Sequence, residues 1–236
     1  MIDVRMFTVG PVHENCYFVR AKGSDRAVIV DPGDEAPRLL EAVQALGITQ
    51  VEAILLTHTH FDHIGAVAPV AAATGAPVYC PELETQVLAN IMDYVPFPGF
   101  GPFESYDADH TVGGGETLEL AGLQFDVTFT PGHSPGHVSY ALTDDLDDST
   151  PVHSGEAGCQ ADRRVEAVFS GDVLFEGSVG RVDLPGGDWP TLLASIESLI
   201  NAYPPETTVY AGHMGITTLG QERDTNPFLR ELAHQD

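Results

Sequence analysis

The sequence predicts an α/β protein built as a four-layer αββα sandwich, in which two sheets face each other and helices cover their outer faces. The expected elements run in the order strands, helix, strand, helix, and the same order then begins again. Two such halves bury their apolar faces by packing sheet on sheet. The 24 glycines and 17 prolines among 236 residues indicate many tight turns between short elements. An apolar fraction of 43% allows a substantial core and excludes a long disordered chain.

The first half begins with three stretches rich in β-branched and aromatic residues, which are typical of strands: 2–9, 15–20 and 26–31. Residues 35–46 carry apolar side chains at helical spacing and end before a glycine, so they predict a helix. A buried strand is expected at 51–56.

Further elements of this half are helices at 64–73 and 81–92, a strand at 77–80, and an irregular loop over 94–115. We expect Pro69 to kink the helix at 64–73 or to delay its start.

The second half repeats this order around an acidic interruption. Strands are predicted at 117–120, 122–129, 136–142, 167–171 and 207–211, with a helix at 189–201. Acidic residues dominate 144–166, which we interpret as an exposed surface insertion within a single domain spanning 1–236.

The charge balance argues against two classes of partner. The chain has 35 acidic and 10 basic residues, for a formal net charge of −25 at pH 7. Binding to nucleic acid or to an anionic membrane needs a basic patch, which these scattered cations do not form. No apolar stretch approaches the roughly 20 residues that span a bilayer, and no secretory signal is recognisable. With three widely spaced cysteines, the chain is predicted to be cytoplasmic with reduced thiols.

Three histidines and one aspartate lie within six residues, directly after the predicted strand at 51–56. In an extended segment His58 and His60 point to the same side, because side chains alternate along the backbone. Asp62 and His63 follow where the chain turns towards a helix, so they can reach a different point nearby. Imidazole nitrogens and carboxylate oxygens are ligands that divalent first-row metals accept. This segment therefore predicts a metal site.

His133, Asp172 and His213 each follow a predicted strand and stand next to a glycine. Glycine lets the backbone pass close to a metal or adopt a φ that other residues resist. If these turns meet at one sheet edge, the chain offers seven nitrogen and oxygen ligands, enough for two metals that share one carboxylate.

Four segments carry a resemblance that covers nearly the whole chain: 57–63 (THTHFDH), 130–137 (TPGHSPGH), 169–172 (FSGD) and 210–213 (YAGH). They resemble the metal motifs of metallo-β-lactamase-fold hydrolases, in the hydroxyacylglutathione hydrolase (glyoxalase II-like) branch. Residues 177–188 (GSVGRVDLPGGD) are similar to those of the compact form without a C-terminal helical domain. The resemblance implies the metallo-β-lactamase fold.

The resemblance also implies a ligand set for two divalent metal ions, with zinc favoured and iron or manganese compatible. One ion would be held by His58, His60 and His133, and the other by Asp62, His63 and His213, with Asp172 bridging. A metal-bridged hydroxide would cleave a thioester such as S-D-lactoylglutathione or a related hydroxyacyl-thiol. Asp62 and Asp172 would be the catalytic residues. The expected partner is this small-molecule substrate, and the oligomeric state is open.

Four other residues are candidates for roles near the site, and two of them are left out of it. Arg181 is predicted to bind a substrate carboxylate, although pairing with Asp183 is an alternative role. Asp31 either supports the site from behind a ligand or only forms the turn before Pro32-Gly33. His110 and His137 match no ligand position.

Other functions on the same scaffold are open. A persulfide dioxygenase would use one iron held by His58, His133 and Asp172. A β-lactamase is disfavoured by the expected cytoplasmic location and by Asp rather than Cys at position 172. A non-catalytic metal-binding module is the alternative to an enzyme. The high negative charge also suggests adaptation to high salt, since salt screens self-repulsion.

Overall fold

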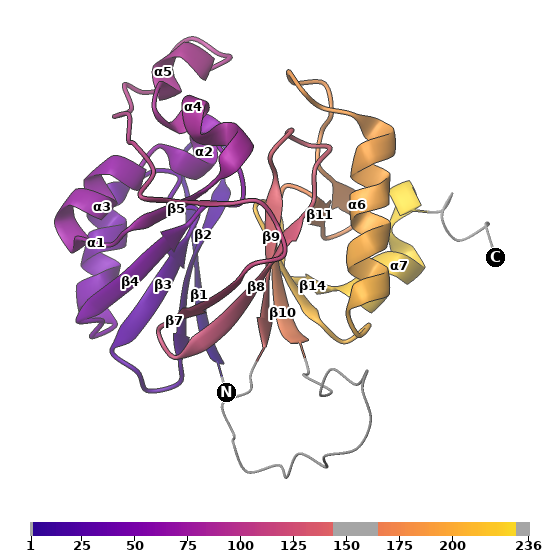
Figure 1. Ribbon diagram of the computed structural model, residues 1–236, viewed down its shortest axis with the longest axis horizontal. Coiled ribbons are helices and arrows are strands. Elements are labelled where there is room, and N and C mark those ends of the chain that lie inside the picture. The colour runs from indigo at the N-terminus through magenta and orange to yellow at the C-terminus, as the bar shows by residue number, and fades with distance from the viewer. Residues whose placement is uncertain (1, 144–164, 230–236) are drawn as a thin grey trace.

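Two six-stranded sheets face each other at the centre of the molecule in the computed structural model, which describes residues 2–143 and 165–229 (Figure 1). The first sheet has the order β1 (Ile2–Val9), β2 (Glu14–Ala21), β3 (Arg26–Val30), β4 (Gln50–Leu55), β5 (Val78–Pro81) and β6 (His110–Val112). The second has the order β14 (Thr217–Thr218), β13 (Thr208–Ala211), β10 (Val165–Gly171), β9 (Val138–Thr143), β8 (Leu123–Phe129) and β7 (Thr117–Leu120). A small hairpin pairs β11 (Leu174–Phe175) with β12 (Ser178–Val179).

Helices cover the outer face of each sheet, so the predicted four-layer α/β sandwich is confirmed (Figure 1). The first sheet carries α1 (Ala36–Ala45) and α3 (Val67–Thr74), and the second carries α6 (Trp189–Ala202) and α7 (Leu219–Thr225). The short elements are α2 (Phe61–Ile64), η1 (Glu82–Glu84), α4 (Thr85–Leu88), α5 (Ile91–Tyr94) and η2 (Pro227–Leu229). None of the helices in the described ranges has the length and apolar character needed to cross a membrane.

Alternation along the central strands divides the interior into three apolar layers. In β3, Ile29 packs under the helices, whereas Val28 and Val30 face the other sheet. The inter-sheet layer is rich in aromatic rings, with Tyr17 edge-on to Phe169 at a centroid distance of 5.5 Å. This layer fixes the two sheets against each other and therefore the loops at their edges.

The structure differs from the sequence prediction in several elements. Residues 64–73 form the end of α2 and most of α3, and Pro69 lies in the first turn of α3, where its missing N–H breaks no helical bond. The helix expected at 81–92 is divided among η1, α4 and α5. The loop expected at 94–115 contains β6, which pairs in parallel with β5. Residues 144–164 of the predicted insertion lie outside the described residues, and 165–166 begin β10.

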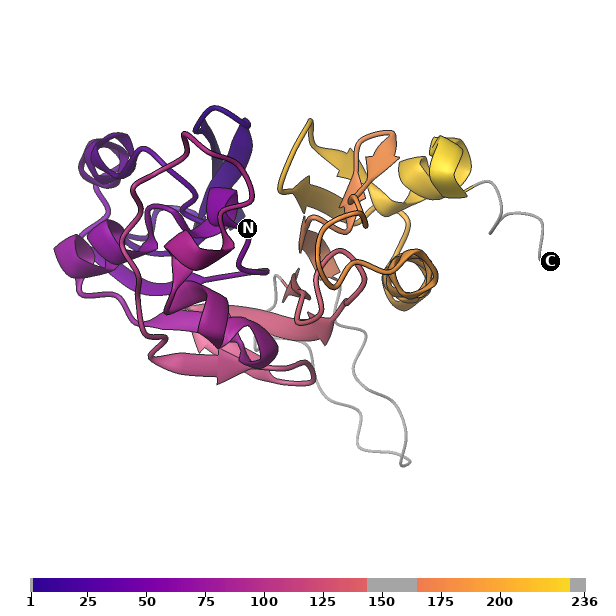
Figure 2. The same ribbon diagram turned by 90° about the horizontal axis from the view of Figure 1, so that it is seen from above.

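The parallel pairs set the position of the candidate ligands. Strands β3, β4 and β5 run in parallel in one sheet, and β10 and β13 do so in the other. Their carboxyl ends reach the upper edge of the sandwich in Figure 1. Seen from above, the indigo-to-magenta first half and the orange-to-yellow second half lie side by side at this edge (Figure 2). Residues far apart in sequence are brought together there.

Candidate metal centre

Three imidazole nitrogens converge at this edge. The loop after β4 provides His58 and His60, and the β8–β9 connection provides His133. Nδ1 of His60 lies 3.1 Å from Nε2 of His58 and 2.8 Å from Nε2 of His133. His58 and His133 are buried, so their ring nitrogens face one another rather than solvent. These atoms form the first group of candidate ligands.

A second group lies beside the first. Asp62 and His63 come from α2, and His213 follows β13. Nε2 of His213 lies 3.3 Å from Oδ2 of Asp62. The short helix α2 turns these two ligands away from the point that His58 and His60 face, as the sequence pattern predicts.

Asp172, which follows β10, lies between the two groups. Its Oδ1 is 3.3 Å from Nε2 of His63, while its Oδ2 is 3.4 Å from Nε2 of His133 and 3.6 Å from Nε2 of His213. One carboxylate therefore contacts ligands of both groups. All seven residues that the sequence pointed to are gathered here.

The spacing and chemistry of these atoms fit divalent metal ions. Zinc bound tetrahedrally at about 2.0–2.1 Å places its ligand atoms about 3.3 Å apart, and the separations given above run from 2.8 to 3.6 Å. Within the described residues, Nε2 of His63 and Oδ1 of Asp172 are buried without a well-formed hydrogen bond. Buried polar atoms left this way are costly unless another group satisfies them. A cation is such a group.

The histidines fall into two electrostatic classes. Burial and the neighbouring imidazoles lower the pKa of His58 well below its usual range and that of His60 to about 4. Burial also favours neutral rings for His63 and His213, but the neighbouring carboxylates, Asp172 foremost, together outweigh it and raise the pKa of both.

The carboxylates show the complementary effect. Burial would raise the pKa of Asp172, yet His63 and His213 hold it well below its usual range. The pKa of Asp62 is also lowered, since the contact with His213 and the charge of His63 exceed the effect of burial. Both carboxylates are therefore ionised near neutral pH.

Residues 9–145 match a family model described as the metallo-β-lactamase superfamily. The chain belongs to this superfamily. Two solved structures are similar over almost the whole chain. The BLEG-1 B3 metallo-β-lactamase is 38% identical with a TM-score of 0.82, covering 96% of this chain and 99% of that one. TTHA1623 in a di-iron-bound form is 40% identical with a TM-score of 0.75, covering 95% and 100%. Among curated relatives, hydroxyacylglutathione hydrolase GloC of Haemophilus influenzae is 29% identical, covering 98% of this chain and 100% of its own.

In this metallo-β-lactamase-superfamily chain, buried partners orient the ligand rings from behind. Asp31 accepts hydrogen bonds from the Thr57 N–H at 2.8 Å and the Thr57 hydroxyl at 2.6 Å, and it lies 3.0 Å from Nδ1 of His63. Of the two roles open for Asp31, the structure shows the supporting one. On the other side, Nδ1 of His133 donates to the Arg181 carbonyl at 2.8 Å. Each bond directs the opposite nitrogen of the ring towards the ligand cluster.

Two glycines allow the ligand-bearing turns of this superfamily fold to approach one another. A Cβ on Gly212 would stand 2.3 Å from Oδ1 of Asp172, so no larger residue fits beside His213. Gly171 adopts a φ of 47°, and a Cβ there would stand 2.4 Å from the Thr57 hydroxyl.

Sequence reasoning missed several residues that hold this site together. Asn15 and Tyr17 of β2 reach across to the second half, where the Tyr17 hydroxyl donates to the Ala211 carbonyl at 2.6 Å and the Asn15 N–H donates to the Gly212 carbonyl at 2.7 Å. Nε2 of His137 accepts the backbone N–H of Asp172 at 3.1 Å. None of these contacts has a local sequence signal, except that His137 lies in the TPGHSPGH segment.

Glu14 and Glu84 were also missed. Glu14 is buried 3.8 Å from Nδ1 of His63, and burial raises its pKa well above the usual range. Glu84 links two ligand-bearing loops through its carboxylate.

Arg181 lies next to the cluster, but its guanidinium is engaged. It makes two hydrogen bonds to the Asp183 carboxylate, at 2.6 and 2.8 Å, and both side chains are more than half exposed. A role in substrate binding remains a prediction that requires Asp183 to be exchanged for substrate.

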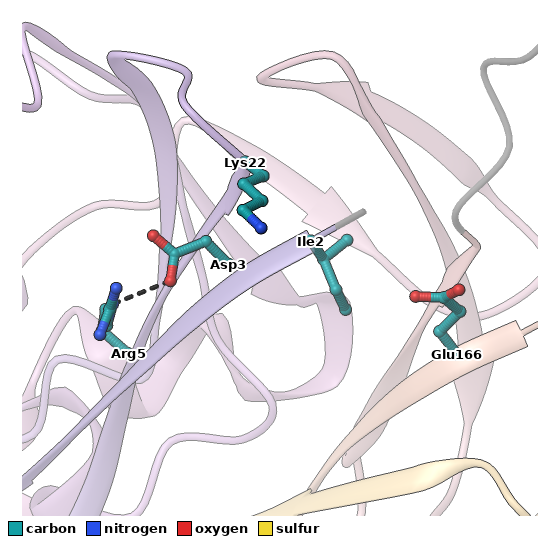
Figure 3. Close-up of a pocket in the computed structure, with 5 residues that line it drawn as sticks. All are labelled: Ile2, Asp3, Arg5, Lys22 and Glu166. Atoms are coloured by element: carbon teal, nitrogen blue, oxygen red, sulfur yellow. Dashed lines mark ion pairs between the residues drawn. The ribbon is translucent and has the colours of Figure 1, made fainter.

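A cavity of 390 Å³ lies beside the first residues of β1 and β10 (Figure 3). It is lined by Ile2, Asp3, Arg5, Lys22 and Glu166, and Arg5 pairs with Asp3 at 2.8 Å. Its position at the start of β1 and β10 places it away from the ligand cluster, and its two acids and two bases offset each other.

Proposed function

We propose that this chain is a metal-dependent hydrolase that cleaves a thioester with two divalent metal ions, zinc in the first instance. The observation that carries the proposal is the pair of ligand groups that share Asp172. The likeness to the di-iron form of TTHA1623 supports two metals, and the 29% identity to hydroxyacylglutathione hydrolase GloC supports the thioester.

The metals, when bound, supply Lewis-acid polarisation of a carbonyl and water of lowered pKa. Asp62 is ionised and lies at the edge of the second ligand group, so its carboxylate can orient a water while acting as a ligand. Asp172 keeps the two ligand groups in register. His63 is held by Asp31, so its ring cannot rotate out of the cluster.

A thioester suits this set of residues. The leaving thiolate is the conjugate base of a thiol with a pKa of about 8.5. Such a group leaves without first being protonated, so a general acid would add little. The imidazoles and carboxylates of the cluster are engaged as ligands, which leaves them unsuited to that task.

Aromatic side chains beside α2 provide an apolar wall for the substrate. Phe61 packs on Phe100 with ring centroids 4.8 Å apart, and Phe97 extends this group at 6.3 Å from Phe100. Tyr94 and Phe97 are about half exposed. Because Phe61 directly precedes Asp62, an acyl group lying on this surface would be close to the ligand cluster.

A second candidate is β-lactam hydrolysis, which is favoured by the likeness to the BLEG-1 B3 metallo-β-lactamase. The same ligand groups would serve an amide carbonyl. The leaving nitrogen of a lactam has a greater need for a proton than a thiolate, and this favours the thioester.

The test is hydrolysis by zinc-loaded protein of S-D-lactoylglutathione, other acyl-thiols and the chromogenic lactam nitrocefin. Oxygen uptake on glutathione persulfide is measured separately with iron-loaded protein, because zinc has no redox chemistry. We expect the parent to cleave thioesters, and we expect the rate of cleavage to fall about 10²–10⁴-fold in Asp62→Ala and Asp172→Ala. Asp224→Ala, at an exposed ion pair, is the control. Faster lactam cleavage, oxygen uptake, or near-normal turnover by either variant would overturn the assignment.

A further inference from the structure

Glu84 lies at the boundary between the two halves of the molecule, in contact with segments of both. It ends η1, directly after β5, and is only 4% exposed. Two ligand-bearing loops contact its carboxylate. One is the loop after β4 that carries His58 and His60, and the other is the β8–β9 connection that carries His133.

Four hydrogen bonds link the carboxylate to these loops. Oε2 accepts the Thr59 backbone N–H at 2.7 Å and the Thr59 hydroxyl at 2.9 Å. Oε1 accepts the Gly136 backbone N–H at 2.9 Å and the Ser134 hydroxyl. Each oxygen therefore binds one backbone N–H and one hydroxyl, and the two oxygens serve different loops.

These partners stand directly beside the ligands. Thr59 separates His58 from His60, and Ser134 follows His133. The three imidazoles come from two halves of the chain, so their mutual distances depend on how the two loops are joined. Glu84 joins them without touching a ligand nitrogen in any contact the structure describes.

The second ligand group has a different cross-link. Tyr17 and Asn15 bind the carbonyls of Ala211 and Gly212, directly before His213. The two groups are thus tied across the halves by separate sets of residues.

We infer that Glu84 is a positioning residue that assembles the three-histidine metal site selectively, while Tyr17 and Asn15 serve the site that contains His213. The inference rests on the proposed two-metal function. Four hydrogen-bond donors converge on Glu84. A carboxylate accepts hydrogen bonds at both of its terminal atoms, whereas an amide accepts at only one. An amide would turn its NH₂ towards a backbone N–H of one loop, whichever way it was oriented. Glu84→Gln therefore separates the loops while keeping the size of the side chain.

The experiment compares the parent with Glu84→Gln, Ser134→Ala and Tyr17→Phe, and uses Glu82→Gln, at an exposed neighbouring glutamate, as the matched control. Zinc affinity is measured by competition with a chelator, and the occupancy of each site by anomalous diffraction. Loss of such supporting contacts usually lowers metal affinity about 10–100-fold. In Glu84→Gln we expect this loss of zinc affinity at the site of His58, His60 and His133, and in Ser134→Ala a smaller loss at the same site. In Tyr17→Phe we expect the loss of affinity at the site that contains His213. Excess zinc should restore turnover in Glu84→Gln.

The inference would be overturned if both sites bound zinc as tightly in Glu84→Gln and Ser134→Ala as they do in the parent. An equal loss of affinity at both sites would overturn it as well. If Glu84→Gln does not fold, Ser134→Ala decides by the same criterion. A parent protein that binds no pair of metals would instead refute the proposed function, so the two failures are distinguishable.

Discussion

The Asp31 carboxylate lies 3.0 Å from Nδ1 of His63, while Asp172 lies 3.3 Å from Nε2 of the same ring. His63 is completely buried, so these two carboxylates determine its tautomer and orientation. When His63 is neutral and donates from Nδ1 to Asp31, the lone pair of Nε2 points into the ligand cluster. Asp31 therefore decides whether His63 can act as a ligand.

Replacing Asp31 with Asn tests this relationship. The amide either presents its NH₂ to Nδ1, which places the ring proton on Nε2, or turns its NH₂ against the Thr57 N–H. We expect the site containing His63 to lose metal affinity by about 10–100-fold with little change in fold. Circular dichroism and zinc competition measure the two effects. Unchanged affinity would show that the contact between Asp31 and His63 does not support metal binding.

Metal binding should release protons from the ligand group that contains His63 and His213. In the metal-free chain the raised pKa values favour the protonated form of these two rings, whereas the lowered pKa values leave His58 and His60 neutral near pH 7. Zinc must displace protons bound to the ligands, so affinity rises with pH until the raised pKa values are passed.

Titration calorimetry at pH 7 in buffers of different ionisation enthalpy counts these protons. We expect protons to be released on full loading, and fewer of them in His213→Ala. A heat that does not vary with the buffer would contradict the assignment of charge.

Freeing Arg181 should change substrate preference. Asp183 occupies its guanidinium through two hydrogen bonds. Exposed ion pairs contribute up to about 1 kcal/mol, so Asp183→Asn should lower KM about two- to five-fold for thioesters that carry a carboxylate, with kcat unchanged. Neutral thioesters serve as the internal control, and Asp224→Asn removes a similar exposed pair elsewhere. An equal effect on charged and neutral substrates would rule out contact between Arg181 and substrate.

The net charge of −25 should make stability depend on salt. The Debye screening length shortens from about 10 Å at 0.1 M to about 3 Å at 1 M salt, which relieves repulsion among the excess acidic groups. For a chain of this size the melting temperature should rise by about 2–4 °C for each kcal/mol gained. Thermal melts in sodium chloride at constant metal content measure this. A flat or falling melting temperature would argue against adaptation to salt.

Local pattern was sufficient to predict most of the longer strands and to select the seven candidate ligands that the fold gathers at one edge. His58, His60, Asp62 and His63 share one short segment, and the turn context of Asp172 and His213 repeats. The supporting contacts were beyond sequence reasoning because they join distant residues: Asn15 contacts Ala211 across 196 positions.

Element length limited the prediction in the same way. Strand β6 has three residues, too few to show alternation, and its pairing with β5 defines it. Glu84 lies in a segment that was expected to be an ordinary helix, and its role depends on both halves being folded together.

The most direct test of the central claim is the metal content of purified protein after zinc loading and dialysis, combined with anomalous diffraction at the zinc edge. The account predicts two ions per chain, one at His58, His60 and His133 and one at Asp62, His63 and His213, with Asp172 reaching both. One ion or none, or zinc bound away from these residues, would contradict it.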